Sequence, residues 1–219
     1  KPTNFLYIVE DGVSDIKEMY VIDPSLHIPE AYLLPRNFAN RDCVSGERKN
    51  VYLHTNSGNI DVDLWIVGRK DSKIAPSRMT VHLSSRCGSI AVKINAINSI
   101  HPFILKVAAE HGPVTVLIPR WFHGTVTCLR NCDISKEVVK HSTHLGVAIN
   151  MVRLFVGDFS VVSGSGFGSE LTKWEPDELR ADMGQGFGTI KYVDEVESVA
   201  SRQDKVESVV SKENKVRLK

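Results

Sequence analysis

The stretch Met79–Ile94, MTVHLSSRCGSIAVKI, carries the pattern that decides the fold. Apolar and polar residues alternate on both sides of the turn-type segment Ser84–Gly88. In a β-strand, alternation places one set of side chains on a buried face and the other set in solvent. The stretch therefore predicts a strand, a tight turn and a second strand.

The same spacing occurs four times along the chain. In each copy a glycine lies five positions after an apolar residue, and a second apolar residue lies seven positions after that first apolar residue. The copies are Leu53–Ile60, Leu83–Ile90, Val107–Val114 and Met183–Ile190, and their turn glycines are Gly58, Gly88, Gly112 and Gly188. Tight turns often need a positive φ, where a Cβ atom is costly. We therefore expect these four glycines to have a structural role in turns, and a degenerate fifth copy to lie at Thr127–Ile134.

Two arrangements fit this spacing. In an antiparallel hairpin, Leu83 would face Ile90 across the strand pair. In the other arrangement the turn is an arc between two neighbouring sheets, and successive copies stack on one another. We expect an all-β protein in which repeated strand–turn–strand units stack as a β-solenoid-like body, with a β-sandwich as the alternative.

Composition limits the classes of function. The chain has 219 residues, 42% of them hydrophobic and 24% charged, which is ordinary for a globular protein with a core. A formal net charge of +1 argues against nucleic acid as a partner, and no apolar run is long enough to span a membrane. The sparse cysteines and the lack of an N-x-S/T sequon favour an intracellular protein. The sequence starts at Lys1 and not at a methionine, so it is also compatible with a secreted protein whose signal peptide has been removed.

The pattern divides the chain into three parts. Residues 1–49 contain a proline-punctuated run, and we expect an extended segment that wraps and caps one end of the stack. Residues 50–194 form the β-repeat body. Residues 195–219 are a charged tail built on a ten-residue repeat, in which valines form one thin apolar stripe if the tail is helical. We expect that tail to be disordered, or to become a helix only with a partner.

Several motifs together resemble one known family. They are Tyr20–Pro29, Asn59–Gly68, Glu110–Arg120, Phe155–Phe159 and Trp174–Leu179. As a set they are similar to a domain family of unknown function from mushroom-forming fungi, whose repeats resemble the β-solenoid-like folds of bacterial putative adhesins. The resemblance covers roughly residues 20–194 and implies a fungal origin and a stacked β fold. It supplies no catalytic residue, and the tail departs from it.

The cysteines and acids give no defined reaction centre. Cys128 and Cys132 could bind a metal or form a disulfide, but no second pair completes a metal site, so free, half-buried thiols are the favoured interpretation. Asp158, Asp177 and Glu178 are interpreted as loop acids without a partner. With no G-x-S-x-G motif and no cysteine–histidine signature, we predict no catalytic residue, no metal and no cofactor.

A few surface positions are weaker candidates. Asp61 and Asp63 share the outward face of one strand, where they could bind calcium or a polymer, and Trp121 with Phe122 could stack on a ligand or cover the core. The favoured function is a non-enzymatic β-repeat module that binds a protein or a glycan, or associates with itself. The alternatives are a carbohydrate-active enzyme that uses acids such as Asp61 and Asp63, and an adaptor that acts through the tail.

Overall fold

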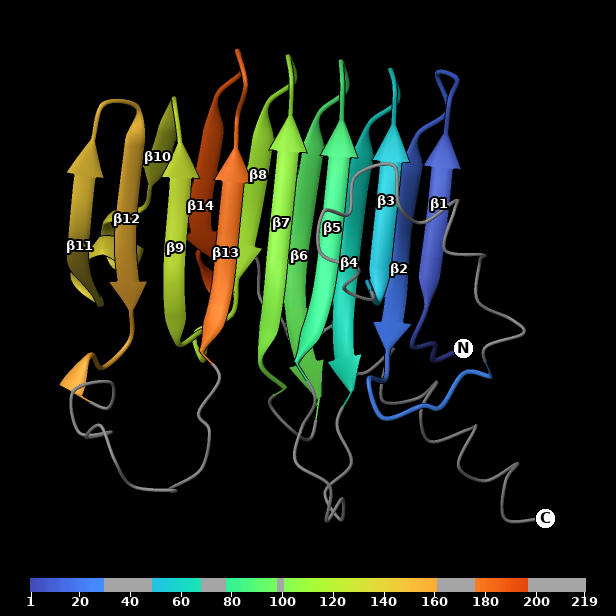
Figure 1. The fold of residues 1–219 in the computed structure, drawn as a ribbon, viewed down its shortest axis with the longest axis horizontal. Helices are drawn as coiled ribbons and strands as arrows, with labels where there is room; N and C mark the ends of the chain where they lie inside the picture. The colour runs from blue at the N-terminus through green and yellow to red at the C-terminus, as the bar shows by residue number, and fades with distance from the viewer. Residues whose placement is uncertain (30–48, 68–77, 98–100, 161–175, 197–219) are drawn as a thin grey trace.

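The computed structural model describes residues 1–29, 49–67, 78–97, 101–160 and 176–196, and these residues are mainly β-strand (Figure 1). The strands are β1 (Leu6–Glu10), β2 (Ile16–Ile22), β3 (Val51–Thr55), β4 (Ile60–Val67), β5 (Met79–Ser85), β6 (Ile90–Ile97), β7 (Phe103–Ala109), β8 (Val114–Ile118), β9 (Gly124–Leu129), β10 (Cys132–Ile134), β11 (Ser142–Ala148), β12 (Met151–Val156), β13 (Asp177–Asp182) and β14 (Gly188–Tyr192). Two short helical elements, α2 (Lys136–Lys140) and η2 (Val193–Glu195), accompany them. The prediction of an all-β protein is confirmed.

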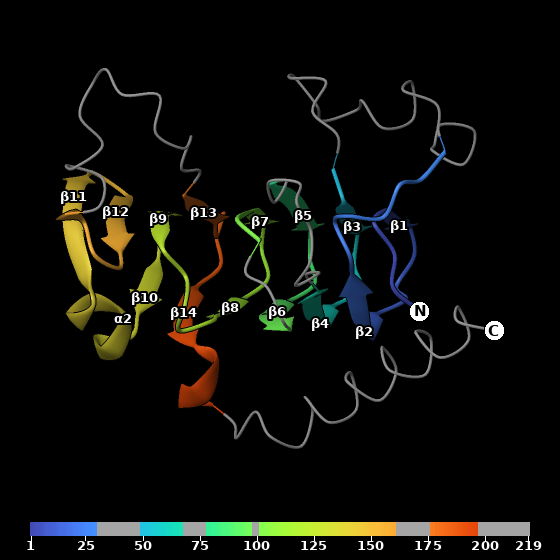
Figure 2. The same cartoon turned by 90° about the horizontal axis from the view of Figure 1, so that it is seen from below.

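The strands form two sheets that lie one above the other (Figure 2). One sheet has eight strands in the order β1-β3-β5-β7-β13-β9-β12-β11, and the other has six in the order β10-β14-β8-β6-β4-β2. Each repeated unit gives one strand to each sheet, as β5 and β6 do. Units pair with their neighbours in parallel, whereas β12 runs antiparallel to both β9 and β11.

This topology separates the two arrangements that the spacing allows. β5 and β6 lie in different sheets, so Leu83 does not face Ile90 in a hairpin. Instead Leu83 pairs with Leu53 and Val107, the equivalent residues of the neighbouring units. The turn at Gly88 is therefore an arc that carries the chain from one sheet to the other.

The core lies between the two sheets. The inward residues Leu53, Leu83 and Val107 of β3, β5 and β7 are at most 2% exposed. Ile60, Ile90 and Val114, which follow them on β4, β6 and β8, are at most 1% exposed. Alternation explains this placement, because a separation of seven residues around the arc returns the apolar side chains to the interior. All these side chains belong to one contiguous core.

The fourth copy is shifted by two residues from the predicted register. Ala181 pairs with Val107, and Gly188 pairs with Val114, so Gly188 is the first residue of β14 and not a turn residue. Gly186, two residues earlier, takes the turn position instead. A Cβ atom on Gly186 would overlap the carbonyl oxygen of Gly112, as a Cβ atom on Gly112 would overlap that of Gly88. The prediction for Gly188 is wrong because the spacing was counted from Met183, which follows the end of β13, whereas the residue in register with Val107 is Ala181.

The unit β9–β10 follows β8 in sequence but stacks outside β13–β14. Cys128 aligns with Ala181 and Val107, and Cys132 aligns with Gly188 and Val114, so the chain crosses between the sheets in a shorter turn than in other units. A disulfide joins Cys128 to Cys132 across this turn, with the two Cα atoms 6.3 Å apart. The interpretation of these cysteines as free thiols is wrong, because the short turn brings them together.

Removing this disulfide is expected to destabilise the fold moderately. A loop this short restricts the unfolded chain only a little, so Cys132→Ala should lower the free energy of unfolding by about 2 kcal/mol. Urea unfolding under non-reducing conditions measures the change. Cys87→Ala is the matched control, because Cys87 is an exposed free cysteine. Equal midpoints for the two variants would contradict the expectation.

The predicted boundary at residue 50 also needs correction. β1 pairs in parallel with β3 over five residues, and β2 pairs with β4 over seven, so residues 6–22 form the first unit of the stack. Glu18 obscured this unit in the sequence, because it takes an inward position opposite Val62 but is exposed at the end of the stack. Residues 30–48 and the tail from residue 197 lie outside the described residues, so the expectation of a disordered or partner-dependent tail stays a prediction.

Candidate binding site on the six-stranded sheet

The outward face of the six-stranded sheet changes from polar to apolar along its strands. On β4 the outward side chains are, in order, Asp61, Asp63, Trp65 and Val67, so the face is polar near the arc and apolar at the far end. Trp65 and Val67 form an apolar cluster with Val21 of β2 and Ile97 of β6, separate from the main core. We call these four residues the outer cluster.

The outer cluster is buried although it faces away from the core. Trp65 is 1% exposed, and the neighbouring outward residues Lys93 and Asn95 of β6 are 5% and 6% exposed. On the eight-stranded sheet, the outward residues His82 and Lys106 are partly buried. Thr80 and Ile104, which lie further from the arcs on the same face, are 6% and 7% exposed. Both outward faces therefore hold buried residues away from the arcs, and the six-stranded face differs in that its buried residues include an apolar cluster of four side chains.

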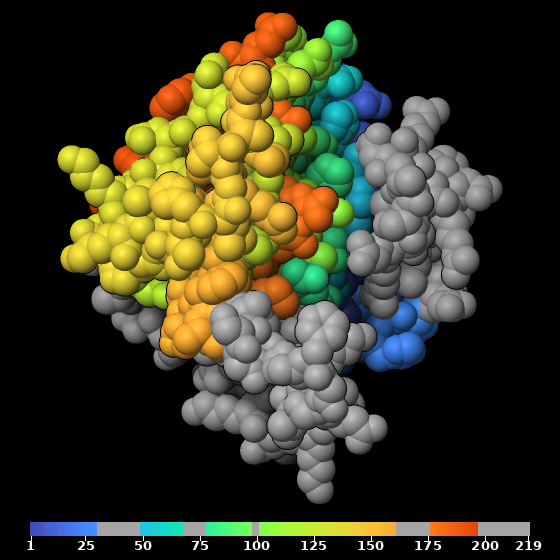
Figure 3. All heavy atoms as spheres, turned by 60° about the vertical axis from the view of Figure 1, so that its left-hand side comes forward, coloured from blue at the N-terminus to red at the C-terminus, as the bar shows by residue number. Residues whose placement is uncertain are grey.

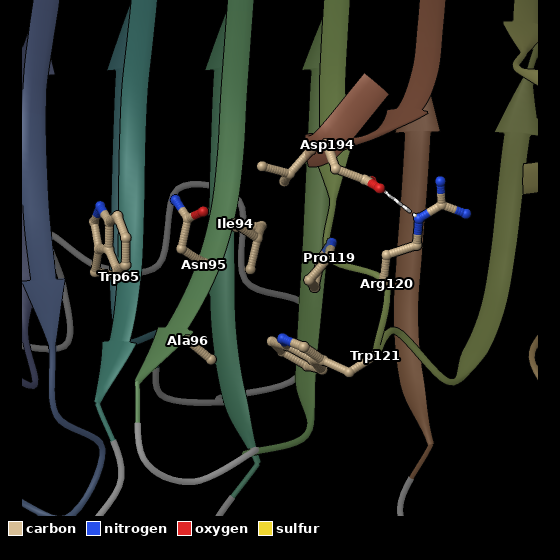
Figure 4. Close-up of a pocket in the computed structure, with 9 residues that line it drawn as sticks. Trp65, Ile94, Asn95, Ala96, Pro119, Arg120, Trp121 and Asp194 are labelled. Carbon is tan, nitrogen blue, oxygen red and sulfur yellow. Dashed lines mark hydrogen bonds and ion pairs between the residues drawn. The ribbon is translucent and has the colours of Figure 1, made fainter. Parts of the chain in front are cut away.

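A small cavity of about 210 Å³ opens beside the outer cluster (Figure 4). Its apolar lining comes mainly from Trp65, Ala96, Pro119, Trp121 and Val193, and its polar lining from Asn95, Arg120 and Asp194. These residues come from β4, β6, the segment after β8, and η2. The cavity thus joins segments that are far apart in the sequence, with an apolar interior and charged groups among its lining.

Arg120 makes the main contacts among the charged residues of the cavity lining. Its Nε donates to both carboxylate oxygens of Asp194, at 2.9 and 3.0 Å, and its guanidinium carbon lies 4.2 Å from the centre of the Tyr192 ring. The hydrogen bond to Asp194 is the main cause that raises the pKa of Arg120 above its ordinary value. Because both side chains are nearly half exposed, the ion pair adds at most about 1 kcal/mol and mainly fixes the position of the guanidinium.

Two buried donors in this region have no hydrogen-bond partner among the described residues. They are Nε1 of Trp65 and Nδ2 of Asn95, on neighbouring strands. A buried donor without a partner costs roughly 1–3 kcal/mol, so such groups are rare and need an explanation. An acceptor from a bound molecule would satisfy both.

The predicted acids Asp61 and Asp63 share the outward face of β4, and neither lines the cavity. Asp61 is exposed and forms an ion pair with Lys17, at 3.4 Å between Oδ2 and Nζ. Asp63 is half-buried and pairs in register with Lys93. The structure therefore places these acids nearer the arc than the outer cluster.

Of the two predicted aromatic residues, Trp121 lines the cavity and Phe122 lies in the core. Trp121 is half-buried, lines the cavity, and contacts the Phe103 ring edge-on at 5.9 Å between centroids. Phe122 is 2% exposed within the core and contacts Phe103 at 5.6 Å, so it is not a surface residue. Trp65 was not predicted, although the run D-V-D-L-W already places it on the same outward face as the two acids.

Asp177 is a buried structural residue, contrary to its interpretation as a loop acid. It begins β13, is 5% exposed, and accepts hydrogen bonds from the backbone N–H groups of Phe103 at 3.0 Å and His123 at 2.9 Å. Burial is the main cause that raises its pKa to about 6, against the lowering effect of these bonds and of Arg78. The carboxylate thus links the starts of β7 and β9 to β13.

Two other features can be checked on the described parts of the chain. Within them, no three histidine, cysteine or acidic side chains gather closely enough to hold a metal ion. The helices among these residues are also too short and too polar to cross a membrane.

Comparison with known proteins places the chain in a family. Residues 4–195 match the model of a family described as a domain of unknown function, DUF7330, and the chain belongs to that family. No curated protein matches, and no solved structure matches. The match spans both sheets and includes β1 and β2, whereas fungal origin and likeness to bacterial adhesins stay predictions.

Proposed function

We propose that this member of the family is a non-enzymatic binding module that takes one apolar side chain of a polypeptide into the cavity beside Trp65. The observation that carries the proposal is the cavity itself, with its mainly apolar lining and two unsatisfied donors nearby. Burial of an apolar side chain there would give affinity, and backbone carbonyls of the bound segment would accept from Trp65 and Asn95.

The size of the cavity supports a polypeptide over a larger ligand. Sites for whole small molecules usually measure about 300–1,000 Å³, which is larger than the 210 Å³ found here. A cavity of this size suits one aliphatic or aromatic side chain, with the rest of the segment lying across the sheet. Aromatic rings and an amide could also contact a sugar, so glycans belong in the test.

The carbohydrate-active alternative has less support. Glycoside cleavage uses two carboxylates on either side of the scissile bond. Asp61 is paired with Lys17, and neither Asp61 nor Asp63 lines the cavity. No specific contact favours a reaction at these acids.

Peptide selection tests the proposal directly. A library of random dodecapeptides displayed on phage is panned on the full chain, and the affinity of an enriched peptide is measured by calorimetry. We expect enriched peptides to share one bulky apolar residue, and Asn95→Ala and Arg120→Ala each to weaken binding by about tenfold. Lys106→Ala, on the outward face of the other sheet, should leave the affinity unchanged.

Chitopentaose and cellopentaose are tested in the same calorimetric assay, and we expect no binding. The proposal fails if either sugar binds in a way that depends on Asn95. It also fails if the selected peptides bind all three variants as well as the original chain.

A further inference from the structure

We infer that β11, the last strand of the eight-stranded sheet, pairs antiparallel with β11 of a second copy of this chain and joins the two eight-stranded sheets into one. Four features of the described residues support this pairing: an open backbone edge, the absence of charge on it, exposed apolar groups beside it, and the match of β11 to itself. None of them involves the cavity, which lies on the other sheet, so the pairing is independent of the proposed function.

β11 has an open backbone edge among the described strands. It pairs with β12 on one side and ends the sheet on the other, so one row of its N–H and C=O groups has no neighbouring strand. All of its residues after Ser142 are exposed. Figure 3, in which this end of the body faces the reader, shows β11 and β12 in yellow and orange at the surface. An open edge of this kind is a template for pairing with another strand.

Charge distinguishes β11 from the other three strands that end a sheet. Those strands carry charged side chains, which are Glu10 on β1, Lys17 and Glu18 on β2, and Asp133 on β10. Charged side chains on an edge strand oppose its pairing with another chain. β11 contains no lysine, arginine, aspartate or glutamate and therefore lacks this protection. A second copy also meets little long-range repulsion, because the net charge of the chain is +1.

Apolar side chains are exposed beside the same edge. Val147 of β11 is 73% exposed, and Ile149 just after the strand is 94% exposed. Val147 lies opposite Val152, whose own neighbour on β9 is the core residue Cys128, so Val147 is on the inward face. The six-stranded sheet ends at β10, and no described strand of that sheet lies opposite β11. Burial of these apolar groups would stabilise a complex at this edge.

The faces of β11 match those of a second β11. A two-fold axis perpendicular to the sheet makes the two strands antiparallel and keeps each side chain on its own face. Ser142 and His144 lie opposite core residues of β12 and face inward, and the bulge at Leu145 shifts the alternation so that Val147 also faces inward. Pairing of like faces then places Val147 opposite Ser142 or His144 of the second copy. Leu145 lies next to the axis in both registers.

The antiparallel arrangement also brings apolar groups of the two copies together. The start of β11 lies beside α2, where the Ser142 hydroxyl donates to the Val139 carbonyl at 2.9 Å, and the Val139 side chain is exposed. The far end of β11, with Val147 and Ile149, therefore lies beside α2 of the second copy. Lys140, the last residue of α2, stays at the opposite end of the interface from its counterpart. Because each copy supplies both the apolar end and the surface that receives it, a second copy is favoured over an unrelated strand.

Sedimentation equilibrium of the full chain, between about 1 and 200 µM, tests the pairing. A small interface predicts a dimer with a dissociation constant on the order of 10 µM. We expect Val147→Glu to weaken the dimer at least about tenfold, because the interface would remove the new carboxylates from water. Val13→Glu is the matched control and should leave the dissociation constant unchanged, because Val13 is exposed between β1 and β2, at the other end of the sheets.

Oxidative crosslinking locates the interface. Leu145→Cys is introduced into the Cys87→Ala chain, so that the exposed thiol of Cys87 cannot react. Because Leu145 lies next to the two-fold axis, we expect a disulfide-linked dimer at protein concentrations near the dissociation constant. Val13→Cys in the same background should give at least about tenfold less of it.

A full chain that stays monomeric at about 200 µM would overturn the inference. Equal dissociation constants for Val147→Glu and Val13→Glu, or equal crosslinking of the two cysteine variants, would also overturn it. Association that continues beyond a dimer would do the same, because two-fold pairing leaves no free β11 edge. Asn95→Ala should dimerise as the original chain does, so the dimer and the binding of peptides at the cavity can fail separately.

Discussion

Replacing Gly112 with alanine is expected to lower the free energy of unfolding by at least about 4 kcal/mol, which would leave much of the protein unfolded. Gly58, Gly88 and Gly112 stack at the arcs, each against the backbone of the preceding unit. A Cβ atom on Gly112 would overlap the carbonyl oxygen of Gly88. Backbone of the neighbouring unit cannot move aside as the end of a flexible side chain could.

The rigidity of the arc explains why the expected loss exceeds that of an ordinary overpacked site. Parallel pairing fixes β7 against β5 and β8 against β6, and the N–H of His111 donates to the carbonyl of Arg86 at 3.0 Å within the arc itself. An added methyl group must therefore separate two units along much of their length. Typical overpacking costs only about 1–3 kcal/mol, because the surroundings there relax.

Urea unfolding, followed by far-ultraviolet circular dichroism, measures this loss. Gly146→Ala is the matched control, because a Cβ atom at Gly146 meets no atom within 4 Å. That variant should stay within about 0.5 kcal/mol of the original chain. A Gly112→Ala protein as stable as Gly146→Ala would show that the arcs are not closely stacked.

Asp177 should make the fold less stable as the pH rises from 4 to 6. Burial raises the pKa of this carboxyl from 3.8 to about 6 in the folded state. Between these values the folded chain holds a proton that the unfolded chain has lost, so stability falls as the pH rises. A shift of this size corresponds to about 3 kcal/mol, and the fall is complete once the pH exceeds the folded value.

The variant Asp177→Asn lacks this titration, so its stability should change less over the same range. The measurement is the free energy of unfolding at several pH values between 4 and 7, compared between the two proteins. Asp158→Asn is the control, because hydrogen bonds from Ser160 lower the pKa of that exposed carboxyl and give the opposite dependence. Parallel curves for the original chain and Asp177→Asn would contradict the expectation.

The sequence could predict the repeated unit because alternation and turn chemistry are local. The strands on either side of Gly58, Gly88 and Gly112 are found where the spacing places them. The shift at Gly188 could not be predicted, because Ala181 and Met183 are both apolar residues of the same alternation, and only the pairing of Ala181 with Val107 decides between them. Spacing alone gives no information about which of two alternating apolar residues pairs with the neighbouring unit.

The candidate site was harder to predict for a related reason. Trp65 and Asn95 meet Trp121 and Asp194 only after several units have stacked and η2 has returned to the sheet. Each residue alone looks like an ordinary strand or loop residue. Asp177 was misjudged in the same way, because its two partners, Phe103 and His123, lie far away in the sequence.

The position of β13–β14 between β7–β8 and β9–β10 has a consequence for synthesis on the ribosome. The first four units can be added one after another, each on its predecessor, as the chain emerges. β9 emerges before β13 and meets a free edge of β7 that belongs to another strand in the finished protein. Its native neighbour arrives only with residues 177–192, so the final architecture cannot be reached by simple growth from the N-terminus. Among the described strands, the last two to be made are therefore the ones that complete the interior.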